Sequence, residues 1–164
     1  MEFMKIRFCL LSSVLALSTA CGTHQVKGEP PYVGISRLSL KADMLTARFD
    51  LRNINDVELE IDAIDIKILA QNIELAHYAS NLSLSVDPNT TEEVSLDKQP
   101  GSSARQLLGD LESGQVSSLP FFLEGRIHTQ RDGYLEFKHE GHLYPIPGRP
   151  GQFRSASSRT REQR

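Results

Sequence analysis

The chain has 164 residues, of which 39% are hydrophobic, 24% charged and 7% aromatic, with no Trp. This length suits one domain, and the composition excludes both a disordered chain and a protein with many membrane spans. The formal net charge of −3 argues against a nucleic-acid-binding protein. Both cysteines, Cys9 and Cys21, lie near the N-terminus, which excludes a disulfide scaffold or a thiolate zinc cluster for the rest of the chain.

Residues 1–20 have the layout of a secretory signal peptide. A short cationic region is followed by an apolar stretch and then by small residues. The apolar stretch is shorter than the roughly 20 residues that a membrane-spanning helix needs. Met4 is an alternative start to Met1, because the residues that follow it open a signal peptide more typically.

Residues 17–22 resemble a bacterial lipoprotein signal, in which the cysteine is lipidated and becomes the first residue of the mature protein. Ala20 and Gly22 flank Cys21 as in such signals, whereas Leu17 lies one place farther from the cysteine than usual. The resemblance implies a diacylglyceryl thioether on Cys21, an N-acyl chain such as palmitate, and anchoring to the outer membrane facing the periplasm. The alternative is an ordinary secreted protein with an early cysteine. If Cys9 is removed and Cys21 is lipidated, no free thiol is left for catalysis, redox chemistry or metal binding.

The remaining chain divides into three parts. Residues 21–31 are polar and end in two prolines, so we expect a lipidated tether. The domain is predicted over residues 32–147. Residues 148–164 are rich in Gly, Pro, Ser and Arg and offer little to bury, so we predict a disordered basic tail. A solvated terminus is favoured over contact with anionic lipid or cell-wall polymer.

Alternation of apolar and polar residues predicts strands over most of the domain. It runs from Leu45 to Leu51, resumes at Val57, and slips by one residue at Ala63 and Ile64. A slip of one residue turns the apolar set to the other face, so we expect a β-bulge or a sharp bend there. Further strands are expected around residues 73–75, 82–86, 94–96, 119–127 and 135–137, with turns at residues 71–72 and 131–133.

One helix interrupts the strands. Ser103 and Gln106 have the spacing of a capping box, three leucines within residues 107–111 form one apolar face, and Gly114 can end the helix. Many short strands in two amphipathic sets, with one short helix, predict a mainly β fold. We expect an immunoglobulin- or fibronectin-III-like β-sandwich.

Residues 49–61, with Asn53-Ile54-Asn55 between two alternating strands, resemble the opening of the late embryogenesis abundant type 2 (LEA-2) family. Its core is also called the water stress and hypersensitive response (WHy) domain, and Ile54 stands where that family usually has Pro. Three later segments resemble the elements that follow in that family. The hairpin corresponds to residues 70–76, the short strand to residues 94–96 and the closing pair of strands to residues 121–143. The resemblance spans roughly residues 33–145. It implies a fibronectin-III- or immunoglobulin-like sandwich with one helix and a role in dehydration and other stress by shielding surfaces; it supplies no catalytic residue.

Histidines near the C-terminus are candidate metal ligands. His139 and His142 flank Glu140, but their spacing is one residue shorter than in the helical zinc motif. Positions three apart in a strand also face opposite sides. A pairing of His128 with His139 across the predicted hairpin would give a surface metal site. We favour exposed polar positions, so no metal, cofactor or catalytic residue is assigned.

Acidic residues cluster in the second predicted strand. Glu58, Glu60, Asp62 and Asp65 could perform acid–base chemistry or bind Ca²⁺. The first three lie on the polar face of an alternating strand, where their charge also discourages edge pairing, so we favour a structural role. The sequence holds no nucleophile elbow, phosphate-binding loop or dinucleotide fingerprint.

We therefore expect a non-enzymatic, lipid-anchored protein of the bacterial envelope that protects in desiccation or related stress. Its partners would be the membrane, through the lipid on Cys21, and stressed client proteins or an envelope partner, with no nucleic acid. The alternative is an envelope binding module that docks a protein partner or carries an apolar ligand. An exposed apolar groove near Phe121, Phe122 and Leu107 would favour that alternative. A hydrolase would need convergent polar groups in a cleft, and the sequence alone places none.

Overall fold

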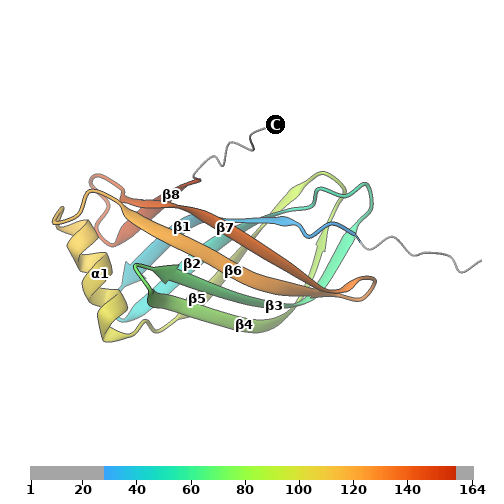
Figure 1. The fold of residues 1–164 in the computed structure, drawn as a ribbon, viewed down its shortest axis with the longest axis horizontal. Coiled ribbons are helices and arrows are strands. Elements are labelled where there is room, and N and C mark those ends of the chain that lie inside the picture. Colours follow the sequence, from blue (N-terminus) through green and yellow to red (C-terminus); the bar gives the residue numbers. More distant parts are fainter. Residues whose placement is uncertain (1–27, 158–164) are drawn as a thin grey trace, which may run out of the picture.

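The computed structural model describes residues 28–157 (Figure 1). The predicted signal peptide, Cys21 and residues 158–164 of the predicted tail lie outside this range. The fold is mainly β with one helix, as predicted. Its elements are β1 (Tyr32–Lys41), β2 (Met44–Arg52), β3 (Leu59–Ala70), β4 (Ile73–Val86), β5 (Thr91–Lys98), α1 (Ser102–Glu112), β6 (Leu119–Thr129), β7 (Gly133–Pro145) and β8 (Gln152–Ser157).

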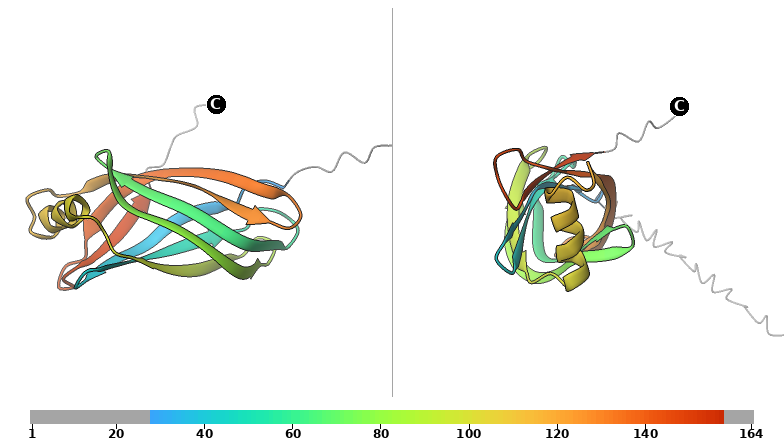
Figure 2. Two further views of the ribbon diagram at one scale, coloured as in Figure 1. Left: turned by 90° about the horizontal axis from the view of Figure 1, so that it is seen from below. Right: turned by 90° about the vertical axis from the view of Figure 1, so that its left-hand side faces the viewer.

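The eight strands within residues 28–157 all belong to one antiparallel sheet, in the order β4-β3-β6-β7-β8-β1-β2-β5. The sheet curls until its two end strands approach one another, so the body is a nearly closed barrel (Figure 2). No ladder of hydrogen bonds joins β4 to β5 in the described chain. The separate sheets of the predicted sandwich are therefore not confirmed.

Strand β8 is the element that makes the sheet continuous. Its neighbours are β7, which it pairs with over residues 141–145, and β1, which it pairs with over residues 37–39. Without β8, the strands β4-β3-β6-β7 and β1-β2-β5 would form two separate sheets. The prediction of a disordered tail was wrong for residues 148–157, because Phe153 is fully buried in the core.

Register shifts interrupt the strands at three places within residues 28–157, one of them between Ile68 and Leu69, where β3 pairs with β4. The predicted bulge is confirmed: the register of β3 with both of its neighbours shifts between Ile61 and Ala63. A second shift, between Ile35 and Arg37 of β1, was not predicted. It breaks the alternation between the inward-facing Ile35 and Leu38, which explains why no strand was expected over residues 32–41.

Helix α1 covers one end of the barrel (Figure 2). Its buried face consists of Ala104, Leu107, Leu108 and Leu111. An isolated helix of 11 residues is marginal in water, so packing of this face stabilises it. Gly101 is the N-cap and no side chain caps the helix, so the predicted capping box was wrong, although the helix itself is confirmed.

Gly125 permits a close approach between β6 and its neighbours. A Cβ atom built at this position would lie 2.3 Å from the carbonyl oxygen of Asp65 and 2.9 Å from Cζ of Phe137. Any larger residue would push strands β3 and β6 apart. No helix within residues 28–157 has the length and hydropathy that a membrane span requires.

Candidate functional site

The Asn53-Ile54-Asn55 turn lies at the end of the barrel opposite α1, which we call the loop end. Asn53 is fully buried. Its Nδ2 donates to the carbonyl oxygens of Val57 (2.7 Å) and Val86 (3.0 Å), and its Oδ1 accepts from the backbone N–H of Asn55 (2.9 Å). A buried amide whose groups are all bonded fixes its surroundings. Asn53 therefore ties the β2–β3 loop to the end of β4.

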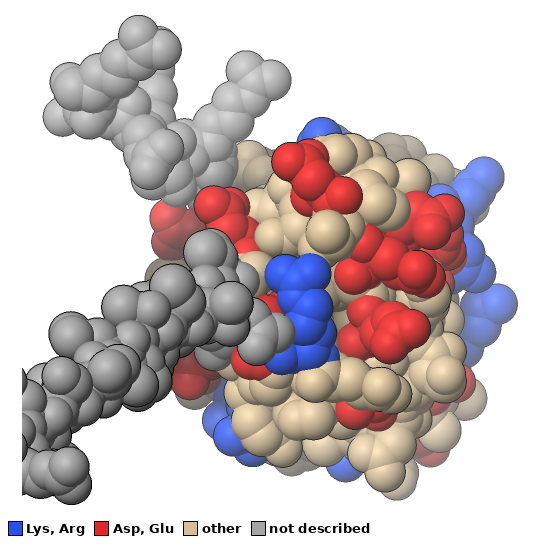
Figure 3. All heavy atoms as spheres, turned by 90° about the vertical axis from the view of Figure 1, so that its right-hand side faces the viewer, with Lys and Arg blue, Asp and Glu red and all other residues tan. Residues whose placement is uncertain are grey.

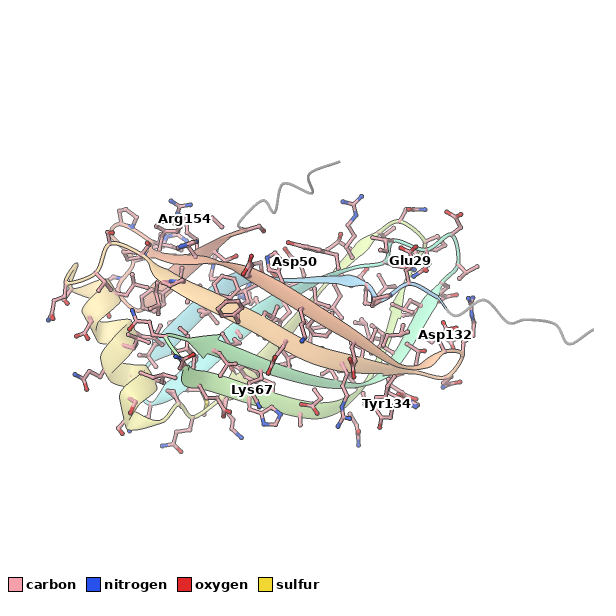
Figure 4. The ribbon with its side chains drawn as sticks, viewed as in Figure 1. Glu29, Asp50, Lys67, Asp132, Tyr134 and Arg154 are labelled. Atoms are coloured by element: carbon pink, nitrogen blue, oxygen red, sulfur yellow. The ribbon has the colours of Figure 1, made fainter. Side chains whose placement is uncertain are left out.

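Asn55 holds the chain that leads into the domain. Its Oδ1 accepts from the backbone N–H of Glu29 (2.9 Å), and its Nδ2 donates to the Glu29 carbonyl (2.9 Å). The N–H of Gly28 donates to Oδ1 of Asp132 (3.2 Å) in the β6–β7 turn. Figure 4 shows Glu29 and Asp132 at the same end of the barrel. We call Asn55 and Asp132, with the two residues that they hold, the N-terminal clamp.

Acidic side chains predominate at the loop end (Figure 3). The exposed ones in its loops are Glu29, Asp56, Glu58 and Asp87. Glu58 accepts a hydrogen bond from Ser85 on the neighbouring strand. This end therefore carries a negative field.

Asp62 and Asp65, from the predicted acidic run, each pair with a histidine on an adjacent strand. The Oδ1 of Asp62 is 2.6 Å from Nδ1 of His128, and that of Asp65 is 2.6 Å from Nε2 of His77. Nη2 of Arg126 lies 3.2 Å from the other oxygen of Asp65. The hydrogen bond from His77, with the nearby positive charges, holds the pKa of Asp65 below its usual value. These contacts join strands of the outer face, which agrees with the structural role favoured for the run.

The register of the β6–β7 hairpin separates the two histidines considered as a metal pair. His128 lies opposite Tyr134, whereas His139 lies opposite Leu123, so the alternative in which they pair across the hairpin does not hold. The hairpin turn at residues 131–133 is confirmed, and its tight closure sets this register. Within residues 28–157, no group of three or more His, Cys, Asp or Glu side chains is arranged to hold a metal ion.

The residues proposed for an apolar groove do not form one. Phe121 and Leu107 are buried in the core, whereas Phe122 is 57% exposed on the outer face. Alternation along β6 places Phe121 and Phe122 on opposite sides of the sheet. An apolar ligand would therefore find no surface shared by these three side chains.

A polar cleft opens where the pairing of β8 ends. Among the described residues, the last pair of β8 with β7 is Ser157 with Gly141, and its last pair with β1 is Arg154 with Arg37. Beyond these positions a hollow of about 410 Å³ separates β7 from β1. Its polar lining consists of Tyr32, Ser36, Asp50, His139, Ser155 and Ser157, which we call the polar cleft.

The side chain of Tyr32 crosses the cleft from β1 to β7 and β8. Its hydroxyl is hydrogen-bonded to Nε2 of His139 (3.2 Å) and to Oγ of Ser157 (3.1 Å). The rings of Tyr32 and His139 meet edge to face with centroids 5.0 Å apart. Gly34 leaves room for this ring, since a Cβ atom there would lie 3.2 Å from Cε1 of Tyr32. Burial lowers the pKa of His139, which favours its neutral form, although the charge of Glu140 opposes this shift.

Asp50 lines the other side of the cleft. It lies opposite Gly34 on β1 and opposite Glu93 on β5. Burial, and then the charge of Glu93, raise the pKa of Asp50, whereas a hydrogen bond from Ser36 lowers it. Directly opposed like charges destabilise a sheet, and Nη1 of Arg48, 3.3 Å from Oε1 of Glu93, offsets part of this cost.

The geometry suits binding better than nucleophilic catalysis. Within the described chain, Ser157 is linked to His139 through the hydroxyl of Tyr32, so its hydroxyl is not bonded directly to the imidazole. An activated nucleophile needs its base within hydrogen-bond reach. What the cleft offers instead is a set of hydroxyl donors and acceptors, one carboxyl group and one imidazole.

This cleft could not be recognised in the sequence. Its side chains come from β1, β2, β7 and β8, and two of these strands were not predicted. The local signal was the alternation of Phe153, Ser155 and Ser157, of which Phe153 is buried, Ser155 is half-buried and Ser157 is exposed. Three alternating positions in a segment rich in Gly, Pro and Arg are too few to predict a strand.

No protein-family model matches the chain, and no curated protein matches it either. Several solved structures are similar. A protein from Archaeoglobus fulgidus is 15% identical, with a TM-score of 0.42 over 70% of this chain and 96% of that chain. AT1g01470 from Arabidopsis thaliana is 14% identical, with a TM-score of 0.49 over 73% of this chain and 82% of that chain. Spo0M, a sporulation control protein from Bacillus subtilis, is 8% identical, with a TM-score of 0.37 over 66% of this chain and 47% of that chain. Likenesses at this level carry no argument about function.

Proposed function

We propose that this chain is a non-enzymatic domain anchored to the bacterial envelope by lipid on Cys21, on the outer membrane facing the periplasm, and that it protects membranes and neighbouring proteins during desiccation or related stress. Support comes from the lipoprotein-like residues 17–22 and from the LEA-2-like residues 49–61. Under this proposal the barrel is a variant of that family's sandwich in which β8 joins the two sheets. The observation that carries the proposal is the N-terminal clamp.

The clamp determines which end of the barrel follows the lipid-bearing segment. Gly28 is held at the loop end, and seven residue steps separate it from Cys21. At 3.3–3.6 Å per residue, this length reaches at most about 25 Å. A lipid on Cys21 therefore places the loop end near the membrane and points α1 away from it.

The charge of the loop end then determines how the domain stands on the membrane. Its exposed carboxylates are repelled by anionic headgroups over roughly one Debye length of 8–10 Å. A short anchor combined with this repulsion keeps the domain close to the leaflet but not pressed against it. We infer that the resulting charged, hydrated layer keeps two leaflets from fusing when water is lost.

The outer face over β3, β6 and β7 supports the same role, because opposite charges lie directly opposite each other. One row across the sheet is Lys67, Glu124 and Lys138. The next row is Asp65, Arg126 and Glu136, with the signs reversed. Such alternation gives a strongly hydrated surface without a large patch of one charge, which limits aggregation when the protein is concentrated.

The test uses the lipid-bearing mature protein in vesicles that contain a trapped dye. Vesicles with the protein should retain more dye after drying and rehydration than vesicles without it. The Cys21→Ser variant, added in equal amount, should protect less and should move to the soluble fraction of host cells. Equal leakage with and without the wild-type protein would refute the protective role. A Cys21→Ser variant that stays membrane-bound would refute the anchor.

Asn55→Ala provides a matched control, since it opens the clamp and leaves the lipid in place. We expect it to remain in the membrane fraction and to lose part of the protection, because the domain is then free to reorient. Protection equal to that of the wild type would show that orientation by the clamp is not required.

A binding module of the envelope is the second candidate function. The polar cleft favours it, but with a polar ligand in place of the apolar ligand expected from the sequence.

A further inference from the structure

We propose that the polar cleft binds a polyhydroxylated ligand, namely a sugar ring, either free or as one unit of a glycan. The hollow of about 410 Å³ lies within the range of 300–1,000 Å³ that is usual for small-molecule sites. It is lined by side chains from four strands, so the scaffold holds their relative positions. This inference is independent of the protective role.

The lining matches the chemistry of a sugar. Each hydroxyl group of a sugar both donates and accepts a hydrogen bond. The hydroxyls of Ser36 and Ser155 already donate to the carbonyl oxygens of Arg48 and Ile35, so their oxygens serve as acceptors for a sugar. The hydroxyl of Ser157 is bonded to that of Tyr32, and either oxygen of this pair can be the donor. The carboxyl group of Asp50 adds a strong acceptor at one side. Tyr32, which is 44% exposed, offers ring surface for the apolar C–H groups of the sugar.

Two side chains that line the cleft lower the stability of the sheet. Asp50 faces Glu93 across strands β2 and β5, and the half-buried His139 interrupts the apolar inward face of β7. Residues chosen only for stability would avoid both arrangements. Local departures of this kind, gathered in one hollow, are typical of binding sites.

The polar groups also lie beside the segment that leads toward Cys21. Tyr32 is the first residue of β1, three residues after the clamped Glu29. A ligand in the cleft would therefore contact the strand that enters from the clamp. A glycan near the anchored leaflet is within reach of this position.

The experiment follows histidine rings by NMR in the lipid-bearing mature protein, held in a detergent without a sugar headgroup. Glucose serves as the free sugar and a tetramer of N-acetylglucosamine as the glycan. We expect a saturable shift of the His139 resonance with at least one of these probes. The resonance of His77, which lies on the outer face, should stay unchanged. Tighter binding of glucose identifies a free sugar as the ligand, and tighter binding of the tetramer identifies a glycan.

Two variants test the lining. Asp50→Asn should weaken binding about tenfold, which corresponds to the loss of one charged hydrogen bond, and Ser157→Ala should weaken it less. Their matched controls on β5, Asp97→Asn and Ser95→Ala, should bind as the wild type does. A His139 resonance that does not shift with either probe overturns the proposal. Unchanged affinity in both cleft variants also overturns it, because binding would then lie elsewhere.

Discussion

Replacing Phe153 by Ala tests whether β8 belongs to the core. The side chain is fully buried, and truncating a buried Phe to Ala costs about 3–5 kcal/mol. Domains of this size unfold with about 5–15 kcal/mol, so the loss removes a large part of the total. With about 3–4 °C per kcal/mol, the melting temperature should fall by roughly 10–20 °C.

The melting temperature is measured by far-ultraviolet circular dichroism, and urea unfolding gives the free energy independently. Arg154→Ala is the matched control, because Arg154 is the next residue of β8 and points outward, with its guanidinium carbon 5.0 Å from the ring centre of Tyr144. An exposed contact of this kind contributes about 0.5–1 kcal/mol. If Phe153→Ala melts no lower than Arg154→Ala, β8 does not join the two halves of the sheet and our description of the fold is wrong.

Four further predictions concern stability. Asn53→Ala should lower the free energy of unfolding by about 1–3 kcal/mol in urea, since it leaves buried carbonyls without a donor; an unchanged midpoint would contradict its role in the loop end. Gly125→Ala should destabilise by at least about 1–3 kcal/mol through its clash with backbone, whereas Gly109→Ala, in open space on α1, should stabilise by about 0.5–1 kcal/mol. The lowered pKa of Asp65 means that its contribution is present above its unfolded pKa near 3.8 and is lost as pH falls through the folded pKa, so acid unfolding of Asp65→Asn should be less steep. The raised pKa of Asp50 has the opposite sign, so Asp50→Asn should raise the melting temperature at pH 7 and leave it unchanged at a pH below the unfolded pKa.

Alternation made most of the strands predictable. It identified β2, β3, β6 and β7, and the slip at Ala63 correctly located the bulge of β3. These strands are long and bury one face, so their pattern is set by neighbouring residues alone. The short helix was also recognised by its apolar face, although Gly101, which has no side chain to donate or accept, caps it in place of the expected serine.

The two strands that were not predicted, β1 and β8, are paired with each other. β1 carries a bulge between Ile35 and Arg37, which disguises its period, and β8 has only six residues. Phe153 is buried because β8 pairs with β1, which lies more than one hundred residues earlier in the chain, and with β7. A local pattern contains no information about such a partner, so the segment looked like a polar tail.

The polar cleft and the continuity of the sheet have the same origin. β8 pairs with β7 and β1 at one end of the gap between them, which joins the two halves of the barrel. Its six described residues are fewer than the ten of β1 and the thirteen of β7, so within residues 28–157 it fills only part of the gap. The ring of Tyr32 spans the remaining part of the gap. Asp50 and His139 line the same hollow there as a result. A longer pairing of β8 would gain backbone hydrogen bonds but would remove that hollow. The register shift in β1 at Ser36 limits the pairing of β8 with β1. This one bulge therefore explains both why β1 was not predicted from the sequence and why the polar cleft forms beside it.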